Sequence, residues 1–411
     1  MKLIQLFLSS LLILSSVRCG KEDGTTPVDP NAVVTFAPVA VNKSNSMKLF
    51  VHYMPWFETK ESSGNGSWGY HWTMKNKNPD IVDANGKREI ASHFYPKIGP
   101  YASSDEAVLE YHMLLMKYAG VDGILIDWYG TYDMYDYGSN KRNTEAIVRA
   151  ATKVGLSFAI VYEDAIVPNV MAQFKIGVGT LVAKTDMKYL NDNFFSKENY
   201  IKIDNKPLFL VFGPQYFKTA AEWTTIFSSL TTKPCFLPLW SLGYLAGANA
   251  SGEYIWVDQT NLDTKYNSIA KLSVGFGGAY PGFKDFYKEG GAGNNLFVID
   301  HNNGAVWDNT LAKAKEHNVN VLQLITWNDF GEGTMIEPTE EFQYLFLEKL
   351  QVFAGVQYQK ADLEAIFKQY ELRKSLAKDA DAQRKLDQAF QFWISLQNNK
   401  AKEILTTLAS K

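Results

Sequence analysis

The sequence predicts an α/β fold, a (β/α)8 TIM barrel with extended loops after its strands and a helical extension at its C-terminal end. Short apolar runs rich in β-branched and aromatic residues alternate with helical patterns, as in parallel α/β folds. Eight such runs occur, and eight strands are the number that closes a barrel of this kind. The chain has 411 residues, which is enough for such a barrel with additions.

The eight expected strands share a short length and a high apolar content. Two of them, VDGILID and VNVLQLI, are apolar almost throughout, as strands buried on both faces must be. We expect strands at residues 48–53, 121–127, 156–162, 207–212, 235–240, 254–258, 272–276 and 320–326.

Helix signals lie between several of these strands. Ser103 and Glu106 have the spacing of a capping box, which predicts a helix that ends at the Gly after Ala119. Asn143 can cap a second helix that ends near Gly155. A third helical pattern, at residues 306–318, leads directly into the last strand.

The last part of the chain has a different pattern, with few Gly and dense charges. Its apolar residues follow helical spacing, which predicts helices over residues 340–411. We expect these helices to pack against a catalytic barrel formed by residues 47–339, and not to form a separate binding module. The apolar positions are Phe342, Leu345, Phe346, Leu350, Phe353, Leu386, Phe390, Trp393 and Leu396.

The N-terminus has the pattern of an export signal. Lys2 precedes an apolar run at residues 3–14, which is too short to span a bilayer but suits the core of a signal peptide. Cys19 follows at the position of a lipoprotein Cys, although the preceding Arg18 is unusual there. The next residues, GKED, resemble the signal that directs some bacterial lipoproteins to the cell surface.

These features predict a signal peptide at residues 1–19, lipidation of Cys19 and a flexible tether at residues 20–46. The protein is then exported, as an outer-membrane lipoprotein with a lipid anchor that faces the cell exterior. A periplasmic location and ordinary secretion with an incidental Cys remain as alternatives.

Composition excludes several classes of partner and cofactor. The net charge of −3 favours neither nucleic acid nor an anionic membrane surface. The six His lack zinc-ligand spacing, and no nucleotide-binding motif follows a strand, so we expect no metal and no cofactor. Cys235 is expected to be a buried strand residue, and we expect a monomer. Aromatic residues make up 14% of the chain, which suits either a large core or a sugar-binding cleft.

Acidic and aromatic residues gather directly after the expected strands. In a (β/α)8 barrel these positions share one face, the face that carries the active site. Basic residues are scarce there, which argues against phosphate chemistry. The residues are Tyr53, Pro55 and Trp56 after the first strand, Asp127, Trp128 and Tyr129 after the second, Tyr162, Glu163 and Asp164 after the third, and Trp327, Asn328, Asp329 and Glu332 after the last.

The segment TWNDFGEGTMIEP, residues 326–338, carries the most specific pattern. Asp329 and Glu332 lie three residues apart, with Gly331 and Gly333 giving the loop backbone freedom. Cleavage of a glycosidic bond needs two carboxyl groups in different protonation states. A D-x-x-E pair alone is usually a solvated surface pair. Its position after a buried strand, at the functional end of a barrel, indicates catalysis.

This segment also resembles a known family. WNDFGEGTMIEPT is similar to the WNEW-x-EGT-x-IEP segment of glycoside hydrolase family 99, the endo-α-1,2-mannosidases and mannanases. The D-x-x-E spelling is similar to WNDYGE of the related family 71, the α-1,3-glucanases. Further matches are VHYMPWF, DGILIDWYG, VYED and GGAYPGF, so the resemblance runs from about residue 48 to residue 338.

The resemblance implies a glycoside hydrolase that cuts α-linked glycans, endo-acting on α-mannan or other mannose-containing oligosaccharides and polysaccharides. It makes Glu332 the general acid/base at the glycosidic oxygen. Asp329 takes the place of a Glu that deprotonates the substrate's own 2-hydroxyl, which gives an anhydro-sugar and net retention. Asp329 is one carbon shorter, a difference in reach of about 1.5 Å.

The shorter side chain leaves room for a water molecule and for inversion, as wider carboxylate separations do in other glycosidases. Two alternatives therefore remain open beside the endo-α-mannosidase. One is an inverting hydrolase similar to the α-1,3-glucanases, and the other is a non-catalytic glycan-binding lipoprotein.

The resemblance also implies supporting roles, each with a structural alternative. Tyr53, Trp128 and Tyr280 are aromatic walls or hydroxyl donors beside the −1 sugar, or barrel packing. Asp127 and Glu163 bind sugar hydroxyls, orient neighbours or form structural ion pairs, and Asn328 orients a catalytic carboxylate. Glu337 is expected to be structural, and His301 either borders the site or belongs to a turn. The remaining substrate-binding candidates are Trp56, His71, Trp72, Tyr129 and Trp327.

Overall fold

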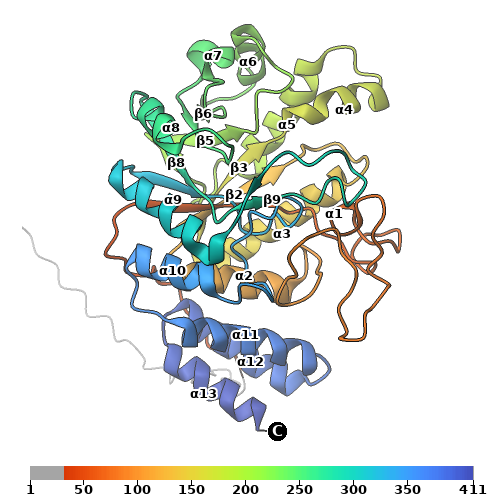
Figure 1. Ribbon diagram of the computed structural model, residues 1–411, viewed down its shortest axis with the longest axis vertical. Coiled ribbons are helices and arrows are strands. Elements are labelled where there is room, and N and C mark those ends of the chain that lie inside the picture. Colours follow the sequence, from red (N-terminus) through yellow and green to blue (C-terminus); the bar gives the residue numbers. More distant parts are fainter. Residues whose placement is uncertain (1–31, 411) are drawn as a thin grey trace, which may run out of the picture.

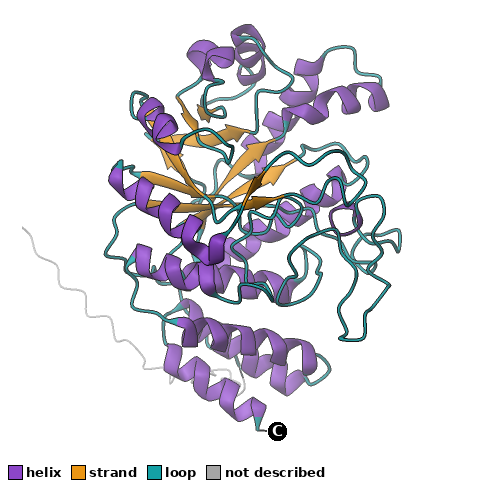
Figure 2. Cartoon of the chain, viewed as in Figure 1, coloured by secondary structure: helices purple, strands orange, loops and turns teal. Residues whose placement is uncertain are grey.

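Eight parallel strands form one curved sheet at the centre of the molecule, in an α/β barrel (Figure 1, Figure 2). The computed structural model describes residues 32–410. The strands are β1 (Lys48–Tyr53), β2 (Gly123–Trp128), β3 (Ser157–Tyr162), β5 (Lys206–Val211), β6 (Cys235–Leu237), β7 (Gly252–Tyr254), β8 (Val274–Ala279) and β11 (Val321–Leu324).

The parallel ladder runs in the order β6-β5-β3-β2-β1-β11-β8-β7. Beyond the end of β6, a single bridge joins Leu239 to Tyr254 of β7, and the Tyr254 N–H donates to Pro238 O at 3.1 Å. The strands follow one another around the sheet in chain order, as in successive βαβ units. The carboxyl ends of β1, β2, β3 and β11 are therefore neighbours on one face.

Each expected strand range overlaps an observed strand, but β6 and β7 have only three residues each. The range expected for β6 extended to residue 240. The ladder ends at Leu237 because Pro238 has no N–H to donate. The expected range 254–258 overlaps β7 only at Tyr254, since β7 begins at Gly252.

Two small antiparallel pairs lie outside the parallel ladder. β4 (Lys202–Ile203) pairs with β5, and β9 (Phe283–Lys284) pairs with β10 (Val298–Ile299). The second pair belongs to the long loop between β8 and α9, and Figure 1 shows β9 close to the barrel opening.

Helices cover the outside of the sheet. They are α2 (Glu106–Tyr118), α3 (Tyr137–Val154), α4 (Val167–Phe174), α5 (Gly179–Asn193), α6 (Ala220–Phe227), α8 (Leu262–Ile269), α9 (Ala305–Glu316) and α10 (Leu345–Ala354). Shorter elements stand in the loops: α1 (Tyr70–Thr73), α7 (Gly243–Ala246), and the 3-10 turns η1 (Asp164–Ile166), η2 (Gly247–Asn249) and η3 (Asn302–Gly304).

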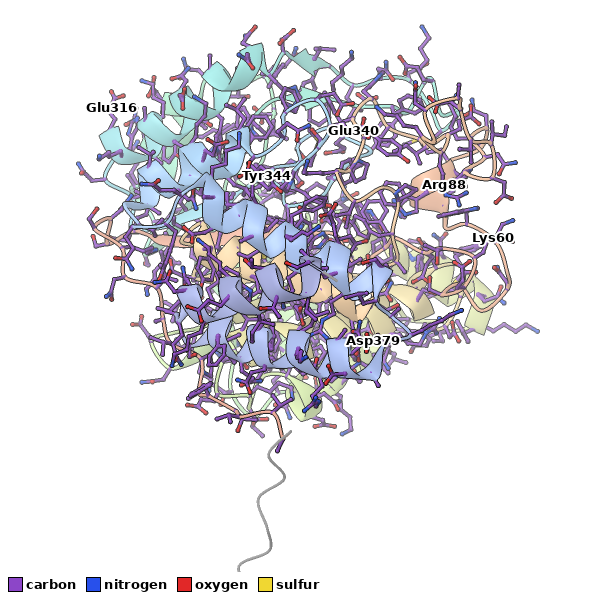
Figure 3. The ribbon with its side chains drawn as sticks, turned by 90° about the horizontal axis from the view of Figure 1, so that it is seen from below. Lys60, Arg88, Glu316, Glu340, Tyr344 and Asp379 are labelled. Carbon is purple, nitrogen blue, oxygen red and sulfur yellow. The ribbon has the colours of Figure 1, made fainter. Side chains whose placement is uncertain are left out.

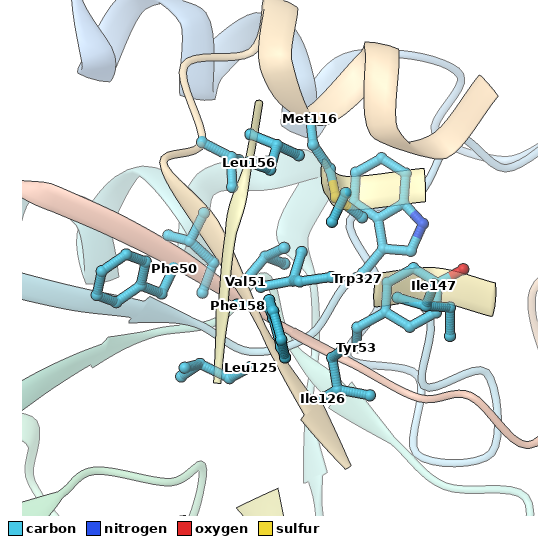
Figure 4. Close-up of a cluster of buried hydrophobic side chains, with 14 of the residues drawn as sticks. Phe50, Val51, Tyr53, Met116, Leu125, Ile126, Ile147, Leu156, Phe158 and Trp327 are labelled. Atoms are coloured by element: carbon cyan, nitrogen blue, oxygen red, sulfur yellow. The ribbon is translucent and has the colours of Figure 1, made fainter. Parts of the chain in front are cut away.

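Alternation along β1 separates two buried layers. Phe50 points into the barrel, where its ring lies 6.2 Å from that of Phe276 on the non-adjacent strand β8. Tyr53 points the other way and bonds His112 of α2. Figure 4 shows part of this outer layer, where Tyr53 and Trp327 lie with Met116 and other apolar side chains. Because successive strand residues alternate, residues of opposite parity face the two layers.

Two expected helix caps are wrong. α2 is capped by Asp105, whose carboxylate accepts from the N–H groups of Ala107 and Val108, while Ser103 Oγ accepts from the backbone N–H of Phe57. Asn143 lies within α3, and its amide donates to Pro55 O at 2.8 Å. The side chains of Ser103 and Asn143 therefore both bond the loop after β1. Local sequence spacing does not reveal such tertiary contacts.

Three more helices follow α10: α11 (Lys360–Ser375), α12 (Ala380–Ile394) and α13 (Asn398–Ala409). α11 packs on α2, where Arg373 forms an ion pair with Glu110 at 2.8 Å. Trp393 of α12 is fully buried, and its Nε1 donates to Gln369 Oε1 at 2.8 Å. Figure 3, which views the molecule from this end, shows these helices lying across the barrel, with Asp379 before α12.

The described part of the expected tether is bound to these helices. The Val39 N–H donates to Ile394 O at 2.9 Å, and the Ser44 N–H donates to Gly355 O at 3.1 Å. Residues 34–45 are therefore attached to the fold, which corrects the expectation of a flexible segment up to residue 46. Cys19 and the expected signal peptide lie outside the described residues.

Within residues 32–410, no single helix has the length and apolar character needed to cross a membrane. One bent pair, Asp164–Phe174 with Gly179–Asn193, meets these criteria only when its two halves, at 111° to each other, are counted together.

The close approach of β7 to β8 leaves no space for a side chain at Gly252. A Cβ atom there would lie 1.6 Å from the carbonyl oxygen of Val274. We expect Gly252→Ala to lower the free energy of unfolding by about 1–3 kcal/mol, the usual cost of overpacking. Denaturant unfolding measures this. Gly177→Ala is the matched control, because a Cβ atom there meets nothing within 4 Å. Equal stability of the two variants would contradict the packing of β7 on β8.

Candidate active site

The loop after β11 holds Asp329 and Glu332 in a fixed relation. The Asp329 N–H donates to Thr326 Oγ1 at 2.8 Å, and the Glu332 N–H donates to Asp329 Oδ1 at 2.9 Å. The carboxylate of Asp329 thus closes the turn that carries Glu332, as Asp side chains often do in loops. The turn therefore fixes the backbone of Glu332 relative to the carboxylate of Asp329.

The loop between β8 and α9 supports this turn from the other side. The N–H groups of Lys284 and Phe286 donate to the carbonyls of Glu332 and Gly331, each at 2.9 Å. In addition, the Tyr287 hydroxyl donates to Glu332 Oε1 at 2.9 Å. Tyr287 was not predicted as a site residue from the sequence, because it lies in a loop without a recognisable motif. It is the side chain that holds the Glu332 carboxyl group.

Asp127 and Glu163 bring two more carboxyl groups to the same place. Asp127 is 2% exposed, and its Oδ2 has no hydrogen-bond partner among the described residues. Burial raises the pKa of Asp127 well above its usual range, and repulsion from Asp329 raises it further. The pKa of Glu163 is raised by burial and then by the charges of Asp127, Asp164 and Glu332.

These repulsions join the four residues into one cluster, called here the carboxyl cluster: Asp127, Glu163, Asp329 and Glu332. Among residues 32–410, no Lys or Arg forms an ion pair with any of the four. Like charges held close together repel one another, so the ionisation of one carboxyl group raises the pKa values of its neighbours in the cluster.

Within the cluster, Asp329 and Glu332 have different proton affinities. Burial raises the pKa of Asp329 to about 6, opposed by the backbone N–H donors of Glu332 and Gly331 and by the nearby His71. Burial and the charge of Asp329 raise the pKa of Glu332 to about 8. Near neutral pH, these pKa values favour a protonated Glu332 and an ionised Asp329, and glycosidic cleavage requires two carboxyl groups in different protonation states.

His71, Trp56 and Tyr129 lie together beside the cluster. The His71 and Trp56 rings stack at 4.0 Å with an interplanar angle of 6°, and the Tyr129 ring lies 6.2 Å from that of Trp56. His71 Nε2 is 3.3 Å from Asp136, which fixes the imidazole ring. All three predicted rings are partly exposed, as rings that meet a substrate must be.

The other predicted aromatic residues are buried in packing. Tyr53, Trp128 and Trp327 face the helix layer. The rings of Tyr53 and Trp327 both contact His112, and the ring of Trp128 stacks on Tyr189. Trp72 lies under the first insertion, stacked on Phe57 at 4.1 Å. Tyr280 packs in a separate apolar cluster with Val257, Phe283 and Ile325. The ring contacts of these five residues are therefore with neighbours in the packed core.

Asn328 and Glu337 tie the catalytic loop to the loop after β1. Asn328 Oδ1 accepts from the Met54 N–H at 2.8 Å, and its Nδ2 donates to Met54 O at 3.0 Å. The Tyr101 hydroxyl donates to Glu337 Oε2 at 2.7 Å, and Glu337 also faces His112 at 3.2 Å. The amide of Asn328 bonds the backbone of Met54 and the Tyr101 hydroxyl, whereas the resemblance implied that it orients a catalytic carboxylate.

His301, predicted either to border the site or to belong to a turn, is buried beneath the catalytic loop. Its Nε2 is 2.8 Å from the carbonyl oxygen of Gly333. Among the described residues, no group of three or more His, Cys, Asp and Glu side chains is arranged to hold a metal ion.

An α/β barrel that gathers uncompensated carboxyl groups after β2, β3 and β11 has the layout of a glycoside hydrolase. The family model for glycosyl hydrolase family 99 matches residues 45–279, more than half of the chain. The chain therefore belongs to this family and is a glycoside hydrolase. The matched stretch ends before the loop that carries Asp329 and Glu332.

Individual relatives extend the comparison. The glycoprotein endo-α-1,2-mannosidase-like protein of Homo sapiens is 22% identical over 320 residues, covering 70% of this chain and 68% of the human protein. The Danio rerio protein of the same name is 20% identical over 360 residues, covering 77% of each chain. A structure of the family 99 endo-α-mannosidase from Bacteroides thetaiotaomicron has a TM-score of 0.57 at 20% identity, covering 75% of this chain and 96% of that one.

The protonated state of Glu332 predicts a pH-dependent stability. Between pH 4.5 and about 8 the folded state holds a proton that the unfolded state has released, so the free energy of unfolding falls as pH rises through this window. Glu332→Gln removes this cost. We expect the variant to raise Tm, with a larger increase near pH 8 than near pH 4.5, measured by thermal unfolding.

Glu198→Gln is the control, because Glu198 is exposed. A Glu332→Gln shift in Tm that is the same at both pH values would contradict the raised pKa of Glu332.

Proposed function

We propose that the protein is an endo-acting α-glycosidase that cleaves α-mannan or other mannose-containing glycans. Glu332 is the general acid/base at the glycosidic oxygen and Asp329 is the base. The observation that carries this proposal is the geometry of the β11 loop, which fixes both side chains in one turn beside Asp127 and Glu163.

In this proposal, the carboxyl groups of Glu332 and Asp329 have different roles. Tyr287 donates to one oxygen of Glu332, and the other oxygen is free to carry the proton that leaves with the glycosidic oxygen. Asp329 Oδ1 accepts from the Glu332 N–H, and Oδ2 is left to act on a substrate hydroxyl or on water. Asp127 and Glu163 supply further acceptors and donors for the hydroxyl groups of the bound sugar.

Substrate class follows from the family and its relatives. The human, zebrafish and Bacteroides relatives are named as endo-α-mannosidases or as proteins like them, which supports an α-mannose linkage as the substrate. Endo action is supported by the partly exposed rings beside the cluster, which suit a chain that passes across the site.

A second candidate, an inverting hydrolase similar to the α-1,3-glucanases, is favoured by one feature. The short Asp329 side chain is held back by its bond to the Glu332 N–H, which leaves space for a water molecule between base and sugar. In the retaining case Asp329 instead takes the proton of the substrate's 2-hydroxyl, and that oxygen attacks the anomeric carbon.

We further propose that the barrel is closed, with the Leu239 bridge to Tyr254 as its seam and residues 340–411 as packed helices. Export with lipidation at Cys19, an outer-membrane location facing the exterior, and a monomeric state are proposals that rest on the sequence pattern.

The division of roles predicts different responses in two variants. Glu332→Gln and Asp329→Asn each lower kcat on α-mannan by on the order of 10²–10⁴, the usual contribution of a general acid or base. An aryl glycoside with a good leaving group needs little protonation of its glycosidic oxygen. With this substrate, we expect Glu332→Gln to regain much of the wild-type rate of the cleavage step, and Asp329→Asn to regain none of it. Initial rates on both substrates measure this.

Glu198→Gln serves again as the control and keeps the rate of the wild-type protein. Near-normal kcat on α-mannan in either active-site variant would refute the role given to that residue.

The stereochemistry of the first product separates the two candidate mechanisms. For the endo-α-mannosidase we expect ¹H NMR to show the α-anomer first, with the β-anomer growing in only by mutarotation. Initial release of the β-anomer would exclude retention through the 2-hydroxyl. It would identify Asp329 as the base that activates water.

A further inference from the structure

A line of aromatic rings leads away from the carboxyl cluster toward the surface. Beyond Trp56 and Tyr129, the Tyr129 ring contacts Tyr137 at 5.2 Å, and Tyr137 contacts Tyr135 at 5.8 Å. At the other end, Tyr70 contacts His71 at 5.6 Å. We call this line the aromatic strip; its members are Tyr70, His71, Trp56, Tyr129, Tyr137 and Tyr135.

The two ends of the strip are open to solvent. Tyr135 is 79% exposed and Tyr70 is 45% exposed, whereas Tyr137 between them is buried and supports its neighbours. The strip is built from two segments, the insertion after β1, which contains α1, and the stretch from the end of β2 to Tyr137, the first residue of α3. Ring contacts connect the members of the aromatic strip from the site to the surface, and residues of both segments contribute to it.

Tyr135 has a backbone conformation that burial cannot explain. Its φ is 48°, in the left-handed region that Gly and Asn adopt most easily. A strained residue with an exposed apolar ring gains little from packing, so the strain points to a function of the side chain. The sequence places Tyr where Gly or Asn would be the stable choice.

We propose that the aromatic strip is an extended carbohydrate-binding surface, in which Tyr135 and Tyr70 form distal subsites for sugars several units from the bond that is cut. Flat aromatic rings suit the C–H faces of pyranoses, so the ring and not the hydroxyl group makes the contact in these subsites. The occupant is an α-linked oligosaccharide chain that begins at the carboxyl cluster. This inference rests on the proposed function, since it extends the same site.

Chain-length dependence of cleavage tests the strip. For Tyr135→Ala and Tyr70→Ala, we expect KM on long α-mannan oligosaccharides to rise about threefold to tenfold, the scale of one aromatic contact. Values of kcat, and of KM on the shortest oligosaccharide that is cleaved, stay at the wild-type level. A rise in KM that is the same for all chain lengths, or no rise at all, would overturn the distal subsites.

Three further variants separate binding from folding. Tyr135→Phe keeps the ring and is expected to behave as the wild-type protein. Tyr135→Asn suits the left-handed conformation, so it keeps or raises Tm while KM rises as in Tyr135→Ala. Tyr244→Ala is the matched control, because Tyr244 is 76% exposed on α7, after a strand on the far side of the barrel from β1. An increase in KM for Tyr244→Ala equal to that for Tyr135→Ala would also overturn the proposal.

A binding measurement distinguishes failure of the strip from failure of the proposed function. In native gels that contain soluble α-mannan, Glu332→Gln is expected to be retarded, and Glu332→Gln with Tyr135→Ala to be retarded less. Retardation of the wild-type protein without release of oligosaccharides would refute the α-mannan hydrolase and leave the strip intact. Equal retardation of the two variants, or retardation of neither while the wild-type protein releases oligosaccharides, would refute the strip.

Discussion

The structure depends on one electrostatic constraint, the gathering of four carboxyl groups, two buried and two partly exposed, with no Lys or Arg paired to any of them among the described residues. Water is the usual means by which clustered acids remain ionised, and Asp127 is almost fully removed from it. Repulsion and burial both favour protons on the cluster and so raise its proton affinity. Asp329 is the exception, because two backbone N–H donors and the nearby His71 oppose the rise in its pKa. The difference between the pKa values of Asp329 and Glu332 follows from these local donors and from the repulsion of Glu332 by Asp329, added to the small difference between an ordinary Asp and an ordinary Glu.

The surrounding fold serves to hold this unfavourable arrangement in place. Asn328 fixes the catalytic loop to the backbone of Met54, and the carbonyls of Gly331 and Glu332 are bound by the β8–α9 loop. Glu337, predicted to be structural, is fully buried among Tyr101 and His112 behind the loop. These bonds link loops that follow β1, β8 and β11, so the positions of the acids are set by the barrel as a whole. Stability lost in the carboxyl cluster is offset by the packed core and by the helices that cover α2.

Much of the fold could be predicted from the sequence, because buried parallel strands leave a strong local signal. VDGILID became β2, with every residue buried, and the helix expected at residues 306–318 became α9. The carboxyl groups of the site could also be predicted, since strand ends of a barrel share one face. What the sequence could not reveal were contacts between distant loops. Tyr287 bonds Glu332 across 45 residues, and Asn143 bonds the loop after β1 across 88 residues. The type of residue at a strand end also does not show whether its side chain points into the barrel or toward the helices. Tyr53, Trp128 and Trp327 were therefore predicted at the site, although they lie in the helix layer.

The central claim is that the carboxyl cluster keeps Glu332 protonated at neutral pH while Asp329 is ionised. Carboxyl ¹³C NMR of protein labelled at Glu, assigned with Glu332→Gln, follows the ionisation of Glu332 directly. The account predicts an apparent pKa near 8 for Glu332 in the wild-type protein, and a lower value in Asp329→Asn, where the neighbouring charge is removed. A Glu332 signal that titrates near 4.5, or one that Asp329→Asn does not change, would contradict the account.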